Sequence, residues 1–177
     1  MNHTKKYLAF DIEIFKSIPD GETDWKRYRP LGISCAATLA SDEAEPLLWY
    51  ERDYSALKNV WDLVTYLDYK IMKGFEIVTW NGLGFDFDIL GEESGMQSRC
   101  AEIAMNHIDM MFHIFCLKGF PLGLNTAALG MGLPGKTDGM DGAQAPDLWR
   151  LGEHEKVLEY VAQDVRTTLA LAQAVDA

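Results

Sequence analysis

The order in which extended and helical segments follow one another limits the folds open to this chain. Three β-type runs come first, over residues 7–14, 31–39 and 46–51, before a helical period over residues 55–73 and a fourth β-type run over residues 75–80. This order predicts an α/β domain with a mixed sheet whose first three strands are antiparallel. A Rossmann domain is disfavoured, because no Gly-x-Gly-x-x-Gly motif follows the first run.

The first predicted helix, over residues 55–73, carries apolar side chains along one face. That face consists of Leu57, Val60, Trp61, Val64 and Leu67. Ser55 is the expected N-cap of this helix and Gly74 its expected end. We expect the apolar face, Trp61 included, to belong to the core.

Beyond the fourth run the sequence predicts mainly helices. A helical region begins over residues 85–90 and continues after a break at residues 91–95. A short helix covers residues 122–131, and residues 153–175 form the helix with the clearest period. Two segments are predicted loops: residues 16–30, which are polar and contain two prolines, and residues 135–146, which contain three glycines.

Composition is that of one folded domain. The chain has 177 residues, of which 48% are apolar, enough for a single core. Its three cysteines are odd in number and far apart, so we expect them to be reduced. No apolar stretch reaches the length of a membrane span, and no signal-peptide core follows the first residues. A cytoplasmic location is the resulting expectation.

Two acidic residues lie near the end of the first β-type run. Asp11 and Glu13 are two positions apart, so in a strand both side chains point to the same face. Considered alone, this pair reads most simply as two solvated charges at a strand end. However, two carboxylates held together repel each other unless a cation lies between them.

A third acid follows the fourth run. Asp86 comes after Asn81-Gly82-Leu83-Gly84-Phe85, where the glycines permit a tight turn from strand to helix. This places Asp86 in the first turn of a helix, where an acid also stabilises the positive end of the helix dipole. Asp88 lies two residues further on, so the two acids cannot share one helix face.

A fourth acid lies on the last predicted helix. Asp164 is four residues after Tyr160, so the two side chains share a face that is otherwise apolar. An acid on such a face needs either a hydrogen-bonding partner within the core or a metal ion. Together the four acids offer hard oxygen ligands, which favour Mg²⁺ or Mn²⁺. Two such ions, roughly 3.5–4 Å apart, activate water and stabilise the leaving oxygen of a phosphodiester.

These acids occur in three motifs that resemble those of the DEDD exonuclease superfamily, which has the ribonuclease H-like fold. The motifs are Phe10-Asp11-Ile12-Glu13, Trp80-Asn81-Gly82-Leu83-Gly84-Phe85-Asp86 and Tyr160-Val161-Ala162-Gln163-Asp164. The second is similar to the exonuclease domains of family-B DNA polymerases and selects Asp86 over Asp88. The tyrosine four residues before the last acid marks the DEDDy branch. The sister branch has histidine five residues before that acid, where this chain has Glu159.

The resemblance extends along most of the chain. Three further segments look like stand-alone bacterial and phage exonucleases related to the polymerase-B proofreading domain: Ile108-Asp109-Met110-Met111, Leu129-Gly130-Met131-Gly132-Leu133-Pro134-Gly135-Lys136 and Gly139-Met140-Asp141-Gly142. The implied structure is a ribonuclease H-like α/β fold with a mixed five-stranded sheet flanked by helices. The implied organisation is a single 3′–5′ exonuclease domain over residues 1–177.

The activity implied by the resemblance is metal-dependent 3′–5′ exonuclease cleavage of single-stranded nucleic acid, with release of nucleoside 5′-monophosphates. Four carboxylates would hold two Mg²⁺ or Mn²⁺ ions, namely those of Asp11, Glu13, Asp86 and Asp164. Tyr160 would orient the attacking water. DNA is the preferred substrate, although the sequence leaves RNA open. Two alternatives are a non-catalytic module that binds nucleic acid or protein on the same fold, and a ribonuclease H-like endonuclease.

Three further residues are candidates for substrate contact: Asn81, Phe85 and Lys136. Asn81 either contacts the terminal nucleotide or shapes its turn, Phe85 lies near the terminal base, and Lys136 reaches phosphate. Basic residues in the loop over residues 16–30 form either a second contact or, slightly preferred, a solvated patch. The net charge of −11 opposes tight binding to a polyanion. We therefore expect bound cations, a small footprint on nucleic acid or a protein partner to offset it.

Overall fold

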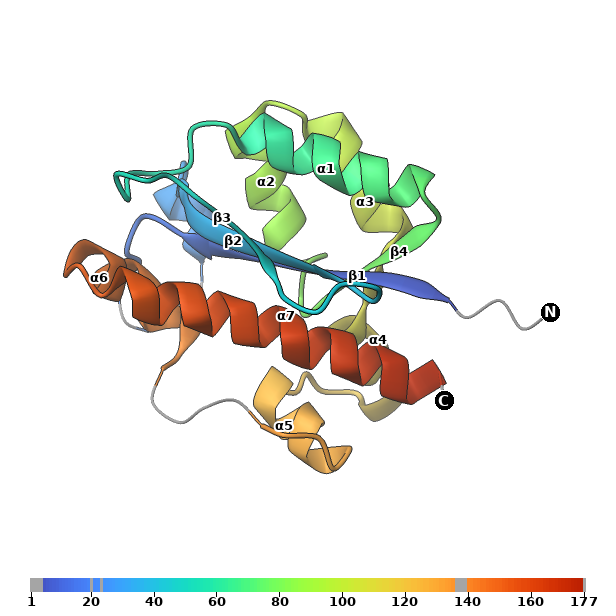
Figure 1. Ribbon diagram of the computed structural model, residues 1–177. Helices are drawn as coiled ribbons and strands as arrows, with labels where there is room; N and C mark the ends of the chain where they lie inside the picture. Colours follow the sequence, from blue (N-terminus) through green and yellow to red (C-terminus); the bar gives the residue numbers. More distant parts are fainter. Residues whose placement is uncertain (1–4, 20, 23, 136–139, 177) are drawn as a thin grey trace.

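The computed structural model describes residues 5–176 apart from 20, 23 and 136–139, and these residues form an α/β fold around one five-stranded sheet (Figure 1). The strands are β1 Lys6–Ile14, β2 Ile33–Ala40, β3 Leu47–Tyr50, β4 Phe75–Thr79 and β5 Ile108–Asp109, in the order β3-β2-β1-β4-β5. β1, β2 and β3 are antiparallel, whereas β4 runs parallel to both β1 and β5. The predicted mixed sheet with three antiparallel strands is confirmed.

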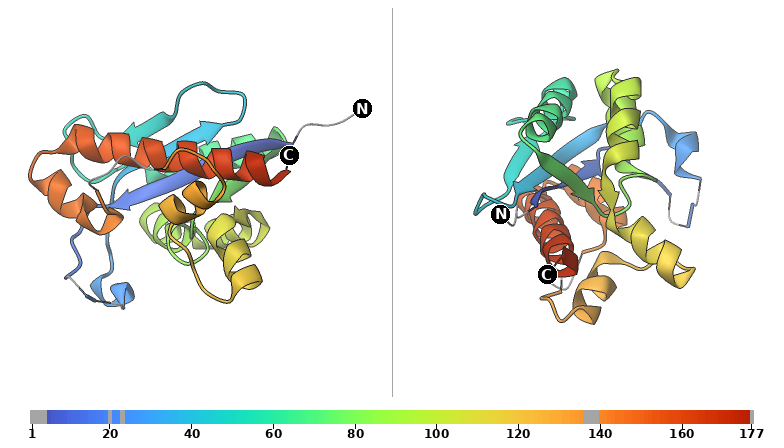
Figure 2. Two further views of the ribbon diagram at one scale, coloured as in Figure 1. Left: turned by 90° about the horizontal axis from the view of Figure 1, so that it is seen from below. Right: turned by 90° about the vertical axis from the view of Figure 1, so that its right-hand side faces the viewer.

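Helices cover both faces of the sheet. They are α1 Val60–Met72, α2 Asp86–Ser94, α3 Gln97–Asn106, α4 Met110–Lys118, α5 Leu124–Gly130, α6 Ala145–Arg150 and α7 His154–Asp176. α1, α2 and α3 lie on one face, and the long helix α7 lies along the other (Figure 1). The right-hand view of Figure 2 shows the sheet between these two layers.

The alternation of side chains along β1 supplies both cores. Leu8, Phe10 and Ile12 are buried against the face that carries α1 and α2. Tyr7 and Ala9 are buried against the face that carries α7. Since successive strand residues point to opposite faces, the odd-numbered positions from residue 7 to residue 13 are directed toward α7.

The start of α1 differs from the sequence-based expectation. The helix begins at Val60 and its N-cap is Asn59, so Ser55 is not its cap. Ser55 instead donates its hydroxyl to Asp53 Oδ1 at 2.7 Å, in a turn where Tyr54 has a φ of 53°. Gly74 follows the helix with a φ of 84°, as expected for a glycine that ends a helix.

Trp61 was expected in the core and is 56% exposed. The buried stripe of α1 is Val60, Leu63, Val64 and Leu67, which follows the spacing of one helix face. Trp61 lies beside that stripe and faces solvent. Leu63 is buried in the position where Trp61 was expected.

Two further helices were not predicted. α4 is apolar on all sides, so no helical period marks it in the sequence, and Met110 is its only buried residue. α6 begins at Ala145, within the segment predicted as a glycine-rich loop, and Pro146 occupies its first turn. Among the described helices, none has the length and apolar character needed to cross a lipid bilayer.

The two faces of α1 give a test of this packing. We expect Leu67→Ala to lower the free energy of unfolding by roughly 2–5 kcal/mol, because it leaves a cavity in the core between α1 and the sheet. Trp61→Ala is the matched control and should cost less than about 1 kcal/mol. Urea denaturation of both variants measures the difference, and similar losses would contradict the assigned faces.

Candidate active site

The acid pair of β1 is directed toward α7. Asp11 and Glu13 continue the odd-numbered series of Tyr7 and Ala9, and Glu13 is only 6% exposed. The pairing of β1 with β2 changes register between Glu13 and Ile14, at the end of the strand. Both carboxylates therefore project from the sheet on the side that α7 covers.

Asp86 reaches these acids because β4 pairs with only part of β1. The parallel pairing runs from Lys6 opposite Phe75 to Ala9 opposite Val78 and then ends. Beyond Ala9 the edge of β1 is open, and there Asp86 Oδ1 accepts the backbone N–H of Ile12 at 3.2 Å. Asp86 is 3% exposed. An acid from the helix after β4 is thus held directly beside the acid pair.

The turn between β4 and α2 has a conformation that few residues adopt. Asn81 has a φ of 71°, a left-handed conformation in which asparagine is one of the better tolerated residues. At Gly82 a Cβ atom would lie 2.4 Å from Thr79 Oγ1, so a side chain cannot fit there without displacement. Asn81 therefore shapes this turn, and it also lines the pocket described below.

Asp88, the neighbouring acid, has a different environment. It forms ion pairs with Lys26, at 3.1 Å, and with Arg29. Arg29 also approaches Glu92 of α2 at 3.5 Å. Two basic residues of the 16–30 loop therefore bind the outer side of α2 through ion pairs, so they do not form the purely solvated patch that was slightly preferred.

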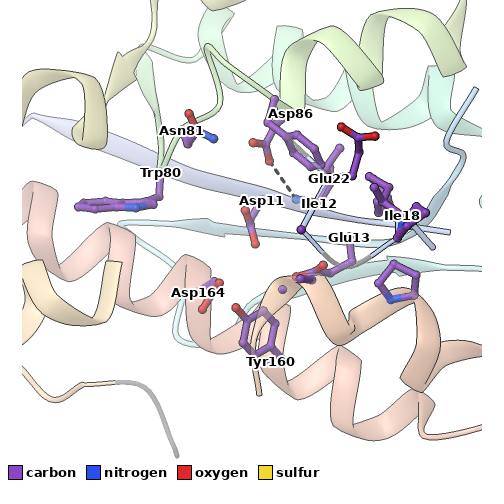
Figure 3. A pocket seen from close by; sticks show the side chains of 17 residues that line it. Asp11, Ile12, Glu13, Ile18, Glu22, Trp80, Asn81, Asp86, Tyr160 and Asp164 are labelled. Carbon is purple, nitrogen blue, oxygen red and sulfur yellow. Dashed lines mark hydrogen bonds between the residues drawn. The ribbon is translucent and has the colours of Figure 1, made fainter. Parts of the chain in front are cut away.

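α7 supplies the other side of the site. Tyr160 and Asp164 are one helical turn apart, and Asp164 is 8% exposed. Figure 3 shows Asp11 between Asp86, which descends from α2, and Asp164, which rises from α7. Tyr160 directs its hydroxyl toward the same space. Three separate parts of the chain thus contribute side chains to one place.

A pocket of about 390 Å³ contains this arrangement. Its acidic lining residues are Asp11, Glu13, Glu22, Asp86 and Asp164. The rest of its described lining is apolar or uncharged and includes Trp80, Asn81, Phe85, Pro146 and Tyr160. No Lys, Arg or His occurs among the described residues that line it. The described lining of the pocket is therefore a place of concentrated negative charge.

The loop before η1 (Trp25–Tyr28) forms the wall opposite Trp80. Ile18 and Glu22 line the pocket from this loop. The Trp25 ring packs edge-on against Phe85 with the ring centroids 5.1 Å apart, which joins the loop to the start of α2. Glu22 was not predicted as a site residue, because nothing in the local sequence shows where this loop folds.

Burial shifts the pKa of two groups of the site, Asp86 and Tyr160. Loss of solvent raises the pKa of Asp86 from 3.8 to about 7, although the N–H of Ile12 and the Asp11 side chain act in the opposite direction. Loss of solvent also raises the pKa of Tyr160, and the negative charge of Asp164 adds to that effect. The phenol of Tyr160 is consequently neutral and able to donate a hydrogen bond at ordinary pH.

The donor set fits a hard divalent cation. Carboxylate oxygens are the ligands that Mg²⁺ and Mn²⁺ prefer, and four of the five acids are those predicted from the sequence. Within the described part of the chain, no three acidic, histidine or cysteine side chains are gathered into a preformed metal cluster. The carboxylates line one pocket without closing into a cage. Lys136, the predicted phosphate contact, lies outside the described residues.

The comparisons with known proteins agree with this fold. A family description of the RNase H superfamily matches residues 31–175, and the chain belongs to that superfamily. The matched stretch includes Asp86, Tyr160 and Asp164, whereas Asp11 and Glu13 precede it. This membership supports a nuclease-type function.

A solved structure is similar over nearly the whole chain. The family B DNA polymerase from the hyperthermophilic archaeon Pyrobaculum calidifontis superposes with a TM-score of 0.70 at 19% sequence identity. The match covers 97% of this chain and 24% of the polymerase chain, so this chain spans about a quarter of the polymerase's length. At this identity the similarity establishes the fold alone. No curated protein matches the chain.

The raised pKa of Asp86 predicts how stability varies with pH. A carboxyl with a raised pKa binds its proton more tightly in the folded protein than in the unfolded chain, so the folded state loses stability as the pH rises from about 4 to about 7. In the presence of EDTA, Asp86→Asn should raise the free energy of unfolding by roughly 1–3 kcal/mol at pH 8. At pH 4 it should bring no gain.

Asp88→Asn is the matched control for this measurement. The positive charges of Lys26 and Arg29 outweigh partial burial and lower the pKa of Asp88, so its charge is favourable in the folded protein. Its replacement should slightly destabilise the protein at pH 8. Thermal unfolding of both variants across this pH range measures the contrast, and a stabilising effect of both or of neither would contradict it.

Proposed function

We propose that this protein is a metal-dependent 3′–5′ exonuclease of the DEDDy type that shortens single-stranded nucleic acid, preferentially DNA, from its 3′ end. The observation that carries the proposal is that Asp11, Glu13, Asp86, Tyr160 and Asp164 line one pocket. They come from a strand, the start of one helix and the face of another. The proposal treats residues 1–177 as a single exonuclease domain.

Asp11, Glu13, Asp86 and Asp164 would hold two ions of Mg²⁺ or Mn²⁺. Bound ions of this kind lower the pKa of water and stabilise the negative charge on the leaving oxygen of a phosphodiester. They would also neutralise the carboxylates, which removes the repulsion between this pocket and a phosphate. In a protein with a net charge of −11, the same ions would therefore serve substrate binding as well as chemistry.

Tyr160 is the proposed group that orients the attacking water. Its hydroxyl is directed into the pocket beside Asp164 (Figure 3), and its raised pKa keeps it protonated at the pH of the reaction. A neutral phenol donates a hydrogen bond to the water oxygen and leaves a lone pair of that oxygen directed at phosphorus. Proton removal from the water is then assigned to the neighbouring carboxylates.

The uncharged part of the pocket suits the end of a single strand. Trp80 and Phe85 offer aromatic surfaces in the pocket lining. Asn81 lies between Trp80 and Asp86 (Figure 3). Aromatic stacking binds an unpaired base without regard to sequence. The proposed preference for DNA is supported by the similarity in fold to a DNA polymerase.

An assay with a 5′-labelled single-stranded oligonucleotide tests the activity. With Mg²⁺ or Mn²⁺ we expect a ladder of products shortened from the 3′ end, which EDTA abolishes. Asp86→Asn and Asp164→Asn should each reduce kcat/KM by about a thousandfold, equivalent to about 4 kcal/mol of transition-state stabilisation. Asp88→Asn, which changes an acid two residues from Asp86 but outside the pocket lining, should stay within about threefold of the wild type.

The same assay separates the alternatives. Cleavage of circular single strands would show a ribonuclease H-like endonuclease in place of an exonuclease. The proposal would be contradicted if folded protein gave no ladder with either DNA or RNA and showed no Mn²⁺ binding by calorimetry. That result would favour a non-catalytic binding module.

The role of Tyr160 has its own test. We expect Tyr160→Phe to lower kcat by roughly 10- to 100-fold, the loss that follows removal of one hydrogen bond to a reacting group, with little change in KM. Because the phenol is neutral throughout, this factor should be the same from pH 7 to pH 9. A loss that grows with pH would instead identify Tyr160 as a base.

A further inference from the structure

We propose that Asp109 is a positioning residue for the candidate active site, because it holds the β4–α2 turn that carries Asn81 and Asp86. This inference rests on the proposed function. Asp109 does not occur among the described residues that line the pocket, so it influences the reaction through the turn and through its negative charge near Asp86. It lies in β5, directly opposite Thr79 at the end of β4.

The carboxylate of Asp109 is buried and accepts three backbone hydrogen bonds. Its Oδ1 accepts from the N–H of Asn81 at 3.1 Å and from the N–H of Phe112 at 3.0 Å. Its Oδ2 accepts from the N–H of Leu83 at 3.0 Å. One side chain thus joins the first turn of α4 to two residues of the β4–α2 turn. Asp109 is only 4% exposed, so water competes little for these hydrogen bonds.

The backbone between the two Asp109 contacts is held by a second side chain. Thr79 Oγ1 accepts the N–H of Gly82 at 3.1 Å and lies 2.9 Å from His107 Nε2. His107 Nδ1 lies 2.6 Å from the carbonyl oxygen of Ala104, which can only accept. His107 therefore donates from Nδ1, and its Nε2 accepts the hydroxyl proton of Thr79. The N–H groups of residues 81, 82 and 83 are all bound by side chains.

Fixing this turn also fixes Asp86. The carbonyl oxygen of Gly82 accepts the N–H of Phe87 at 3.1 Å, and that of Asn81 accepts the N–H of Gly84 at 3.1 Å. The first turn of α2 is therefore hydrogen-bonded to the residues that Asp109 and Thr79 hold. Asn81 requires such support, because its left-handed conformation costs energy for a residue other than glycine. A displacement of about 1 Å at a reacting site can cost about a hundredfold in rate.

Asp109→Asn separates the capping of α4 from the support of the β4–α2 turn. An asparagine has one acceptor oxygen in place of two. In the orientation that loses fewest bonds, this oxygen keeps Asn81 and Phe112, and the new NH₂ group faces the N–H of Leu83. The cap of α4 is then preserved while the β4–α2 turn loses a contact. Asp109→Ser is a second variant, since serine caps a helix well but is too short to reach the turn.

The test combines amide exchange, metal binding and kinetics. In metal-free Asp109→Asn we expect the amide of Leu83 to exchange at least 10-fold faster, while that of Phe112 is unchanged. Mn²⁺ affinity measured by calorimetry should fall by roughly 10- to 100-fold. kcat should fall by a similar factor, with a smaller change in KM for the oligonucleotide. Asp109→Ser should show the same pattern.

Glu43→Gln is the matched control for a loss of stability alone. It removes the charge that faces the buried Lys70 at 2.6 Å, on the α1 side of the sheet. It should lower the melting temperature and leave Mn²⁺ affinity unchanged. The proposal is overturned if both Asp109 variants bind Mn²⁺ as the wild type does, if Glu43→Gln reproduces their loss, or if Mn²⁺ affinity falls while the amide of Leu83 exchanges as in the wild type, since the lost charge near Asp86 would then explain the effect. Failure of the proposed function is distinct, because the wild-type protein would then show no 3′ shortening.

Discussion

A single hydrogen bond at the open edge of β1 organises the candidate site. β4 pairs with β1 only as far as Ala9, which leaves the N–H of Ile12 available, and the carboxylate of Asp86 accepts it. Through this bond an acid from the α2 side of the sheet meets an acid pair directed toward α7. Without the early end of β4, the sheet would separate Asp86 from Asp11 and Glu13. The site is thus a product of strand lengths as much as of acidic residues.

The concentration of acids has an electrostatic consequence for the whole protein. Five carboxylates line a pocket in which the described lining residues include no basic side chain, and the chain already has a net charge of −11. Burial makes the charged form of Asp86 unfavourable in the absence of a cation, as its raised pKa records. Cation binding would therefore be coupled to the protonation of the site, to the stability of the fold and to the approach of a phosphate.

The sequence reveals the parts of the site that depend on local periodicity. The two-residue spacing of Asp11 and Glu13 and the four-residue spacing of Tyr160 and Asp164 each place side chains on one face, and the structure brings both pairs to one pocket. Glu22 and Asp109 follow from no such spacing, because their positions depend on contacts between distant segments. For Asp109 a weak signal existed, since it is an acid immediately before an apolar helix. Trp61 was misplaced because a neighbouring leucine fits the helix stripe better.

The account depends most directly on cations lying among the four carboxylates. Anomalous scattering from a crystal grown with Mn²⁺ locates such ions without reference to activity. The account predicts two anomalous peaks inside the pocket, bonded to oxygens of Asp11, Glu13, Asp86 and Asp164, which disappear in the Asp86→Asn, Asp164→Asn double variant. Peaks confined to other acidic residues, or an empty pocket at a Mn²⁺ concentration that supports nuclease activity, would contradict it.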